Sequence, residues 1–345
     1  MSLIKIKSFL DHKRGLSYWD GADRNAMNLE QGRFAVADGV SHSFLPNLWA
    51  GILCESFVNS KVWAEADWIR LYADNQLTFD CQRWSKMVEA TMQNATEDEA
   101  FLLQLSRDEF HYAGSTLVGI AIKERSVHYN VLGDSCLFVF DKEAETLVPI
   151  STINEGEGFT NRPDYFLSSG KVVGNWKHGQ MPLKEGYVFL MTDALSDWLI
   201  KEYAQNPAVL DQLWNLNTHD EFMRLVEEAR DADVMKDDDV ALMMLKIESG
   251  EEGGYELLCC DTLESLMAQE QKESNDDATK VATDLYTPKE NETSSFEEVG
   301  AKKGSHVVEP VFRYRYVCPI CGHRYYQETA RYCGMCGFPR GGVCK

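Results

Sequence analysis

Four aspartates of this sequence stand where apolar, strand-like runs begin or end. FAVA (34–37) leads into Asp38, NVLG (130–133) into Asp134 and VFLMT (188–192) into Asp193, whereas Asp238 precedes VALMMLKI (240–247). Antiparallel neighbours would bring Asp193 and Asp238 to one edge of a sheet, and Asp38 and Asp134 end their strands in the same sense. An aspartate after a strand is ordinary turn chemistry. Four carboxylates at one edge would raise one another's pKa values. Together, the four aspartates therefore predict bound cations at this edge.

The donor atoms in this cluster indicate which cations. Carboxylate oxygens without accompanying histidine favour the hard ions Mg²⁺ and Mn²⁺ over zinc or copper. The 345 residues carry a net charge of −21. Because this charge is negative, the main part of the chain would repel nucleic acid.

A second set of candidate ligands lies near the C-terminus. Cys318 and Cys321, then Cys333 and Cys336, form two CxxCG turns, and four thiolates satisfy one tetrahedral, structural Zn²⁺. A redox CxxC is the rival interpretation, and rubredoxin-like iron has the same ligands. The segment resembles a zinc ribbon. Its interleaved Arg and Tyr residues permit nucleic-acid stacking, but we favour a protein partner.

The elements that must position the acids follow from hydrophobic periodicity. Residues 34–37, 116–122, 126–132, 136–140, 187–191 and 240–247 are short β-branched or aromatic runs, which indicates strands. Residues 48–60 and 82–105 repeat apolar positions at three and four, which predicts helices, with further helices at about 196–204 and 219–231. The scattered cysteines Cys54, Cys81 and Cys136 are expected to be small core residues.

Charge and composition divide the chain into three parts. Residues 1–247 form the predicted catalytic domain, 248–310 an acidic and mostly disordered linker, and 311–345 the zinc ribbon. The stretch 248–300 holds 15 acidic residues against 3 basic ones and has too few large apolar residues to offset the entropy of folding. A short helix is predicted at 255–269, with two open interpretations: it docks on a partner or the main domain, or it is local and has no target.

The expected location is cytoplasmic. The N-terminus lacks a secretory segment, and no run of 18 uncharged apolar residues occurs. The cysteine pattern fits a reducing compartment. We therefore expect no membrane partner.

Five motifs in register resemble protein phosphatase 2C enzymes. VADGVSHS (36–43) is similar to the family's DG metal-binding turn, AGSTLVGIAI (113–122) to its GST strand and VLGDSCLFVF (131–140) to its GDSR hairpin. LMTDALSDWL (190–199) is similar to the SDGLWD segment and DDVALMML (238–245) to the closing DN strand. The resemblance spans about residues 10–247.

This resemblance implies the fold and the reaction. The fold class would be α+β, an α-β-β-α sandwich of two antiparallel sheets flanked by helices, with the small zinc ribbon added. The chain would be a metal-dependent protein-serine/threonine phosphatase, a phosphoric monoester hydrolase in which two Mn²⁺ or Mg²⁺ ions activate water. Its partners would be phosphoprotein substrates and an opposing Ser/Thr kinase.

The resemblance also implies residue roles. Asp38 would bridge two ions, with the Gly39 carbonyl on one of them and Asp193 and Asp238 on the other. Asp38, Asp193 and Asp238 would thus be the catalytic ligands, Asp134 would match a looser third-ion position, and Asp23 would act through a bound water.

Substrate contacts are harder to assign. Tyr18 stands where many family members have a phosphate-binding arginine, and Ala22, Ala194 and Cys136 also depart from the family pattern. Four side chains are candidates for binding substrate: Arg14, Arg24, His42 and Arg162. His42 could also serve as the proton donor or be a structural histidine, and Arg162 could belong to an ordinary solvent loop. Two other functions stay open: an inactive scaffold that binds phosphoproteins, and a nucleic-acid-associated regulator that acts through the zinc ribbon.

Overall fold

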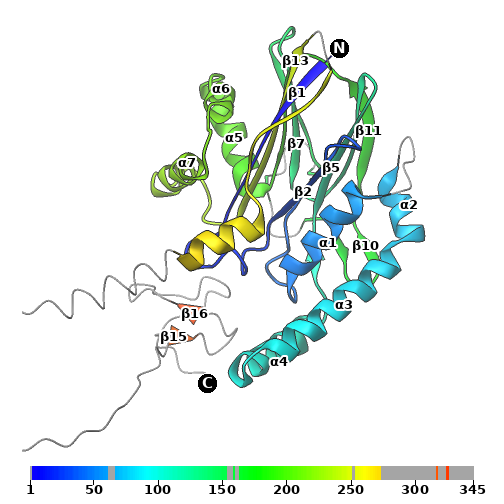
Figure 1. The fold of residues 1–345 in the computed structure, drawn as a ribbon, viewed down its shortest axis with the longest axis vertical. Coiled ribbons are helices and arrows are strands. Elements are labelled where there is room, and N and C mark those ends of the chain that lie inside the picture. Colours follow the sequence, from blue (N-terminus) through cyan, green and yellow to red (C-terminus); the bar gives the residue numbers. More distant parts are fainter. Residues whose placement is uncertain are drawn as a thin grey trace, which may run out of the picture.

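Two β-sheets pack face to face, with helices on both outer faces (Figure 1). The structure, a computed structural model, describes residues 2–60, 67–153, 158–159, 163–250 and 253–272, and the backbone of 316–317 and 324–325. The space between the sheets is filled by one apolar cluster drawn from both of them, including Ile6, Phe34, Val118, Leu190 and Met243. This α-β-β-α sandwich agrees with the α+β architecture predicted from the sequence.

The first sheet has six strands in the order β14-β1-β13-β12-β7-β8. Their bounds are β1 (Ser2–Asp11), β7 (Cys136–Asp141), β8 (Thr146–Ile150), β12 (Gly186–Met191), β13 (Val240–Ser249) and β14 (Gly254–Cys260). All neighbours are antiparallel except β1 and β14, which are parallel.

The second sheet has five antiparallel strands in the order β11-β6-β5-β3-β2. Their bounds are β2 (Arg24–Asn28), β3 (Arg33–Ala37), β5 (Leu117–Lys123), β6 (Ser126–Leu132) and β11 (Lys177–Pro182). A small third sheet joins β4 (Gly114–Ser115), β9 (Tyr165–Leu167) and β10 (Lys171–Val173).

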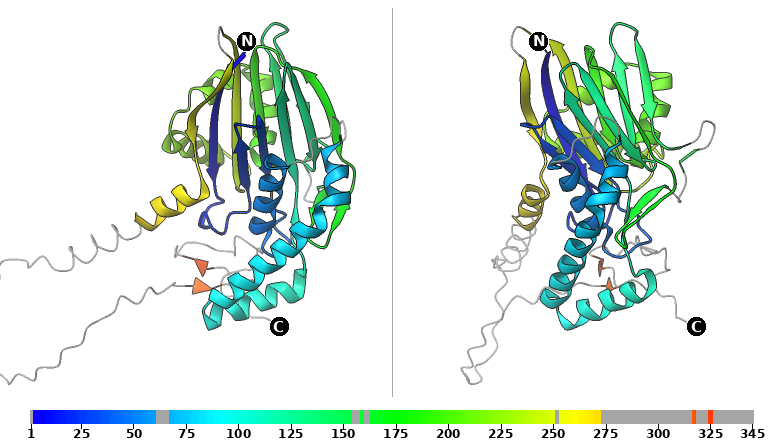
Figure 2. Two further views of the ribbon diagram at one scale, coloured as in Figure 1. Left: turned by 45° about the vertical axis from the view of Figure 1, so that its right-hand side comes forward. Right: turned by 90° about the vertical axis from the view of Figure 1, so that its right-hand side faces the viewer.

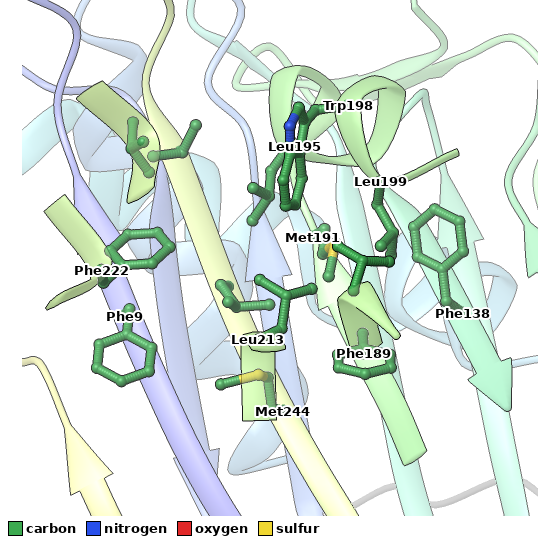
Figure 3. Close-up of a cluster of buried hydrophobic side chains, with 14 of the residues drawn as sticks. Phe9, Phe138, Phe189, Met191, Leu195, Trp198, Leu199, Leu213, Phe222 and Met244 are labelled. Carbon is green, nitrogen blue, oxygen red and sulfur yellow. The ribbon is translucent and has the colours of Figure 1, made fainter. Parts of the chain in front are cut away.

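Helices α5 (Asp193–Gln205), α6 (Val209–Trp214) and α7 (His219–Asp231) cover the outer face of the first sheet. Figure 3 shows Phe9, Phe189 and Met244 of the sheet meeting Leu213 and Phe222 of the helices. Successive residues of a strand point to opposite faces. Because both faces of this sheet are covered, its strands are apolar throughout rather than alternating with polar residues.

Helices α1 (Pro46–Val58), α2 (Trp68–Asn75) and α3 (Leu77–Asn94) cover the second sheet, and α4 (Glu97–Phe110) follows them (Figure 2). The predicted single helix over 82–105 is wrong, because the chain breaks between α3 and α4. Ala95 is extended, and Thr96 caps α4 in a reciprocal capping box with Glu99.

The six predicted strands and the helices at 48–60, 196–204 and 219–231 are all present within one to three residues of their expected ends. Three strands of the first sheet were not anticipated: β1, β8 and β14. The last of these, β14, replaces the beginning of the helix predicted at 255–269: residues 254–260 pair with β1, and a helix begins only at 263. Pairing with a distant strand has overridden an ambiguous local pattern, so the packed domain continues beyond residue 247.

The cysteines of the core behave as expected, since Cys54 and Cys136 are fully buried and Cys81 is half-buried. Among the described residues, no helix combines the length and the hydrophobicity needed to cross a membrane.

Candidate active site

The turn at Asp38 and Gly39 follows β3 and is held by the Gly114–Thr116 segment. Thr116 N donates to Asp38 O at 2.8 Å, and Asp38 N donates to Thr116 Oγ1 at 3.0 Å. Ser115 Oγ also donates to Asp38 O, at 2.9 Å. The backbone of this turn is therefore fixed by uncharged hydrogen bonds.

Glycine at position 39 permits a close approach of another loop. A Cβ added at Gly39 would lie 2.8 Å from Pro46 Cβ and 3.0 Å from both Cβ and O of Ala22. A larger residue at either position would push the loop that carries Asp23 away from the turn. Crowding at this contact gives a physical reason for a small residue at position 22.

Asp134 lies in the tight connection between β6 and β7. Gly133 has φ +103°, and a Cβ there would lie 2.5 Å from Thr116 Cγ2, so the connection needs glycine. Thr116 Oγ1 lies 2.7 Å from Ser135 Oγ, which joins this connection between the two sheets to the Asp38 turn. Asp134 is 4% exposed, and its Oδ1 has no hydrogen-bond partner among the described residues.

Asp193 and Asp238 stand at the same end of the first sheet. Asp193 follows β12, Asp238 precedes β13, and these strands are antiparallel neighbours with Met191 opposite Leu242, as the sequence predicts. The ammonium of Lys236 lies between the two carboxylates, with Nζ 3.4 Å from Asp193 Oδ2 and 2.5 Å from Asp238 Oδ2. Nothing in the sequence pattern pointed to this lysine.

Arg230, in the last turn of α7, fixes the backbone of Asp238. Its Nη2 donates to Asp238 O at 2.6 Å, and its Nη1 donates to Asp11 Oδ2 at 3.1 Å and to Glu227 Oε1 at 2.7 Å. The side chain is 1% exposed, so these bonds are shielded from water. Sequence reasoning missed this residue because its buried acidic partner, Asp11, is distant in the chain.

Asp23 and Asp239 bring a further loop to the cluster. Asp239 accepts hydrogen bonds from Lys13 N and Ala22 N, both at 2.7 Å. Thr192 donates its hydroxyl to Asp23, yet Asp23 Oδ2 is buried without a hydrogen-bond partner among the described residues. Asp239 was noticed in the sequence only as a neighbour of Asp238, and the structure makes it the anchor of this loop.

The aspartates influence one another strongly. Burial raises the pKa of Asp38 well above its usual range, and the charges of four others add to this effect: Asp23, Asp193, Asp134 and Asp238. Burial and then the charge of Asp193 raise the pKa of Asp134 to about 7. The prediction that these acids share one edge of a single sheet is wrong, because β3 and β6 belong to the second sheet and β12 and β13 to the first. The acids gather where the ends of two packed sheets meet.

The donor set fits hard divalent cations. Its donors are carboxylate oxygens. One oxygen each of Asp23 and Asp134 is buried without a hydrogen-bond donor in the part of the chain that the structure describes, which is costly unless a cation or proton is near. Among the described residues, no three His, Cys, Asp or Glu side chains already converge as a ligand set. The carboxylates of Asp193 and Asp238 both contact Lys236 Nζ, so an ion could use these oxygens only after that ammonium moves away.

The predicted substrate-binding side chains are mostly engaged elsewhere. Arg14 pairs with Glu227 and Asp231 on α7. Arg24 is buried and donates to backbone carbonyls of its own loop, so its role is structural. His42 is exposed just past the Asp38 turn, and Arg162 lies outside the described residues.

Tyr18 does not replace the missing arginine as a free phosphate ligand. Its Oη lies 2.7 Å from His219 Nε2, and His219 Nδ1 lies 2.7 Å from Asp261 Oδ2. Leu10 N also donates to Asp261. This chain of contacts ties the segment after β14 to β1 and α7.

The four cysteines of the predicted zinc site, Cys318, Cys321, Cys333 and Cys336, lie outside the described residues. Two short strands near them are described: β15 (Tyr316–Val317) and β16 (Arg324–Tyr325) pair antiparallel. The zinc ribbon stays a prediction.

Comparison with known proteins gives a family match. The family model described as Protein phosphatase 2C matches residues 21–230; Asp38 and Asp193 lie inside this range and Asp238 beyond its end. No curated protein matches the sequence.

Among solved structures, the serine/threonine phosphatase Stp1 from Staphylococcus aureus is 17% identical, with a TM-score of 0.46 over 71% of this chain and 95% of that one. The S. agalactiae serine/threonine phosphatase is 15% identical, with a TM-score of 0.47 over 71% and 100% of the two chains. The catalytic domain of the serine threonine protein phosphatase PstP, in complex with 2 manganese ions, is 15% identical, with a TM-score of 0.41 over 72% and 100%.

Proposed function

This chain belongs to the protein phosphatase 2C family, a family of serine/threonine protein phosphatases, and on that premise we propose that it hydrolyses phosphoserine and phosphothreonine in proteins with the help of a pair of divalent cations. The observation that carries this proposal is the cluster of buried and half-buried aspartates from two sheets. Burial and the charges of neighbouring acids raise the pKa values of Asp38 and Asp134, and one oxygen each of Asp23 and Asp134 lacks a hydrogen-bond partner among the described residues. Groups with pKa values shifted in this way are concentrated at functional sites.

Each acid has a proposed role. Asp38 and the Gly39 carbonyl would hold one Mn²⁺ or Mg²⁺ ion, and Asp38, Asp193 and Asp238 would hold a second. Asp134 would contribute to a looser third position, and Asp23 would act through water. When bound, such ions lower the pKa of water and neutralise charge on the phosphoryl oxygens.

The chain's own residues hold the acids of the site in position. The hydrogen bonds from Thr116 and Ser115 hold the Asp38 turn, and Arg230 and Asp239 hold the backbone around Asp238 and Asp23. Phosphoryl transfer depends mainly on such positioning and on charge neutralisation. The imidazole of His42, exposed beside the turn, is a candidate proton donor to the leaving alkoxide.

We assign the C-terminal segment a binding role. Cys318, Cys321, Cys333 and Cys336 would hold one structural Zn²⁺, because two CxxCG turns match a closed tetrahedral thiolate site. The small domain so formed would bind a protein, such as the substrate or a regulator. The cytoplasmic location and the opposing kinase remain predictions from the sequence.

A phosphopeptide assay tests the proposed activity. The wild-type chain should release phosphate with Mn²⁺ and stop on chelation. Asp38→Asn and Asp193→Asn should each lower turnover by about 10²-fold or more, as expected for loss of a charge-stabilising group. Asp74→Asn is the matched control, since Asp74 is exposed on α2, and it should behave as wild type.

One outcome would contradict the proposal. If the wild-type chain bound the phosphopeptide in Mn²⁺ but released no phosphate, the chain would be the phosphoprotein-binding scaffold instead.

A further inference from the structure

Lys236 is the side chain whose position the proposed reaction does not explain. It lies in the loop before β13, and its ammonium contacts Asp193 Oδ2 at 3.4 Å and Asp238 Oδ2 at 2.5 Å. Partial burial opposes the charge of this lysine, but the two aspartates outweigh it and raise its pKa. The charge of Lys236 also reaches Asp134. The side chain thus faces three acids of the cluster.

Lys236 contacts the two carboxylates that the proposed function assigns to a divalent ion. A monovalent ammonium and a divalent cation cannot share the same two carboxylate oxygens, because like charges a few ångströms apart repel. Lys236 must therefore leave before an ion occupies this side of the site. The side chain is 52% exposed, so it can turn towards solvent without disturbing the core.

Once released, Lys236 would be a free cation beside the site. Arg14 is committed to Glu227 and Asp231, and Arg24 to backbone carbonyls. Tyr18, at the position of the family's phosphate-binding arginine, faces His219. A lysine is well suited to bind a phosphate as a mobile point charge.

We propose that Lys236 is a switchable cation, which occupies the Asp193–Asp238 pair in the metal-free protein and binds the substrate phosphate once a divalent ion has displaced it. This inference rests on the proposed function, because it requires a metal site and a phosphate substrate. It differs from the fixed arginine of the family pattern, because one ammonium would first neutralise the two carboxylates and then bind the substrate phosphate.

Two measurements on Lys236→Met test the proposal. The first is Mn²⁺ affinity, measured through the loss of the free-ion signal in electron paramagnetic resonance. Removing the competing ammonium should tighten Mn²⁺ binding by about twofold to fivefold, the scale of one partly exposed ion pair. The second is steady-state kinetics at saturating Mn²⁺, where KM for a phosphopeptide should rise about tenfold with little change in kcat, as expected when ground-state binding is lost.

The control variant is Lys201→Met. Lys201 is exposed on α5 and pairs with Asp197, so its removal changes the net charge equally without freeing an acid of the cluster. It should leave both the Mn²⁺ affinity and KM unchanged. Lys236→Arg should keep KM close to wild type.

The outcomes separate this inference from the proposed function. If the wild type binds no Mn²⁺, the proposed metal site fails. If the wild type binds Mn²⁺ and turns over substrate, but Lys236→Met has unchanged or weaker Mn²⁺ affinity, or an unchanged KM, the switch is wrong while the phosphatase assignment stands.

Discussion

The two sheets hold their acids in different ways. The Asp38 turn at the end of the second sheet and the Asp134 connection, which crosses from β6 of that sheet to β7 of the first, are joined by uncharged hydrogen bonds through Thr116; we call this the hydroxyl half. On the first sheet, Asp193 and Asp238 form the cation half, whose carboxylates and backbone are bound by positively charged side chains.

This difference separates a preformed part of the site from an adjustable one. Hydroxyl and amide groups keep their partners whether or not an ion is present, so the hydroxyl half has its shape in advance. In the cation half, Arg230 is buried and permanent, but Lys236 is half-exposed and replaceable. Metal loading should therefore act mainly on the cation half.

The largest expected effect comes from removing the permanent cation. Arg230→Met leaves Asp11 buried without its partner and frees the Asp238 carbonyl. Breaking a buried ion pair in this way costs about 3–5 kcal/mol in the free energy of unfolding, and Mn²⁺ affinity should fall as well. Urea denaturation measures the free energy of unfolding, and titration with Mn²⁺ followed by electron paramagnetic resonance measures the affinity.

The control for this variant is Arg14→Met. Arg14 pairs with two acids of α7, but its side chain is 40% exposed, so the change should cost less than about 1 kcal/mol. Equal costs for the two variants would mean that Arg230 does not anchor the cation half.

A smaller effect is expected in the hydroxyl half. Thr116→Val removes the acceptor of Asp38 N and the partner of Ser135 Oγ, both in a buried region. Leaving buried polar groups unpaired costs about 1–3 kcal/mol. Because no charge is lost, the cost should not change with ionic strength, and Thr116→Ser should recover most of it. A cost that falls with added salt would contradict the distinction between the halves.

The smallest expected effect is a pH dependence of the free energy of unfolding, and it comes from His219 in α7, on the outer face of the first sheet. Burial alone would lower the pKa of His219, but its hydrogen bond to Asp261 and the charges of Asp261, Asp11 and Asp220 outweigh this, so the pKa is raised. The facing groups also include the hydroxyl of Tyr18. A raised pKa stabilises the fold fully below the unfolded-state value of about 6.5, and this contribution is lost as the pH rises through the folded-state pKa.

The comparison of wild type with His219→Gln isolates this contribution. The advantage of the wild type in free energy of unfolding should be largest at low pH and shrink as the pH rises, while the aspartates common to both proteins cancel. Thr116→Val should show no such trend against wild type. An advantage that grew with pH would contradict the assigned charge state of His219.

The hydroxyl half was the easier part to predict from sequence. The residues around Asp38, the Gly114–Thr116 segment and Asp134 are short motifs whose chemistry is local. The antiparallel relation of Asp193 and Asp238 also followed from where each stands relative to its strand. Even the break between α3 and α4 had a visible signal, because Thr96 and Glu99 have the spacing of a capping box.

The cation half could not be predicted in the same way. Arg230 reaches Asp11 only because α7 packs against β1, and nothing near Arg230 in the sequence marks that contact. The strand β14 depends equally on a distant partner, since Tyr255 packs against Phe34 of the second sheet. Local pattern states which residues prefer a strand or a turn, whereas long-range packing decides which side chains meet.

The central claim is that acids from two sheets together hold divalent cations, and Mn²⁺ counted per chain by equilibrium dialysis tests it most directly. The account predicts about two ions on the wild-type chain and fewer on both Asp38→Asn, from the hydroxyl half, and Asp193→Asn, from the cation half, with Asp74→Asn unchanged. A wild-type chain that bound no Mn²⁺, or Asp38→Asn and Asp193→Asn chains that bound as much as wild type, would contradict it.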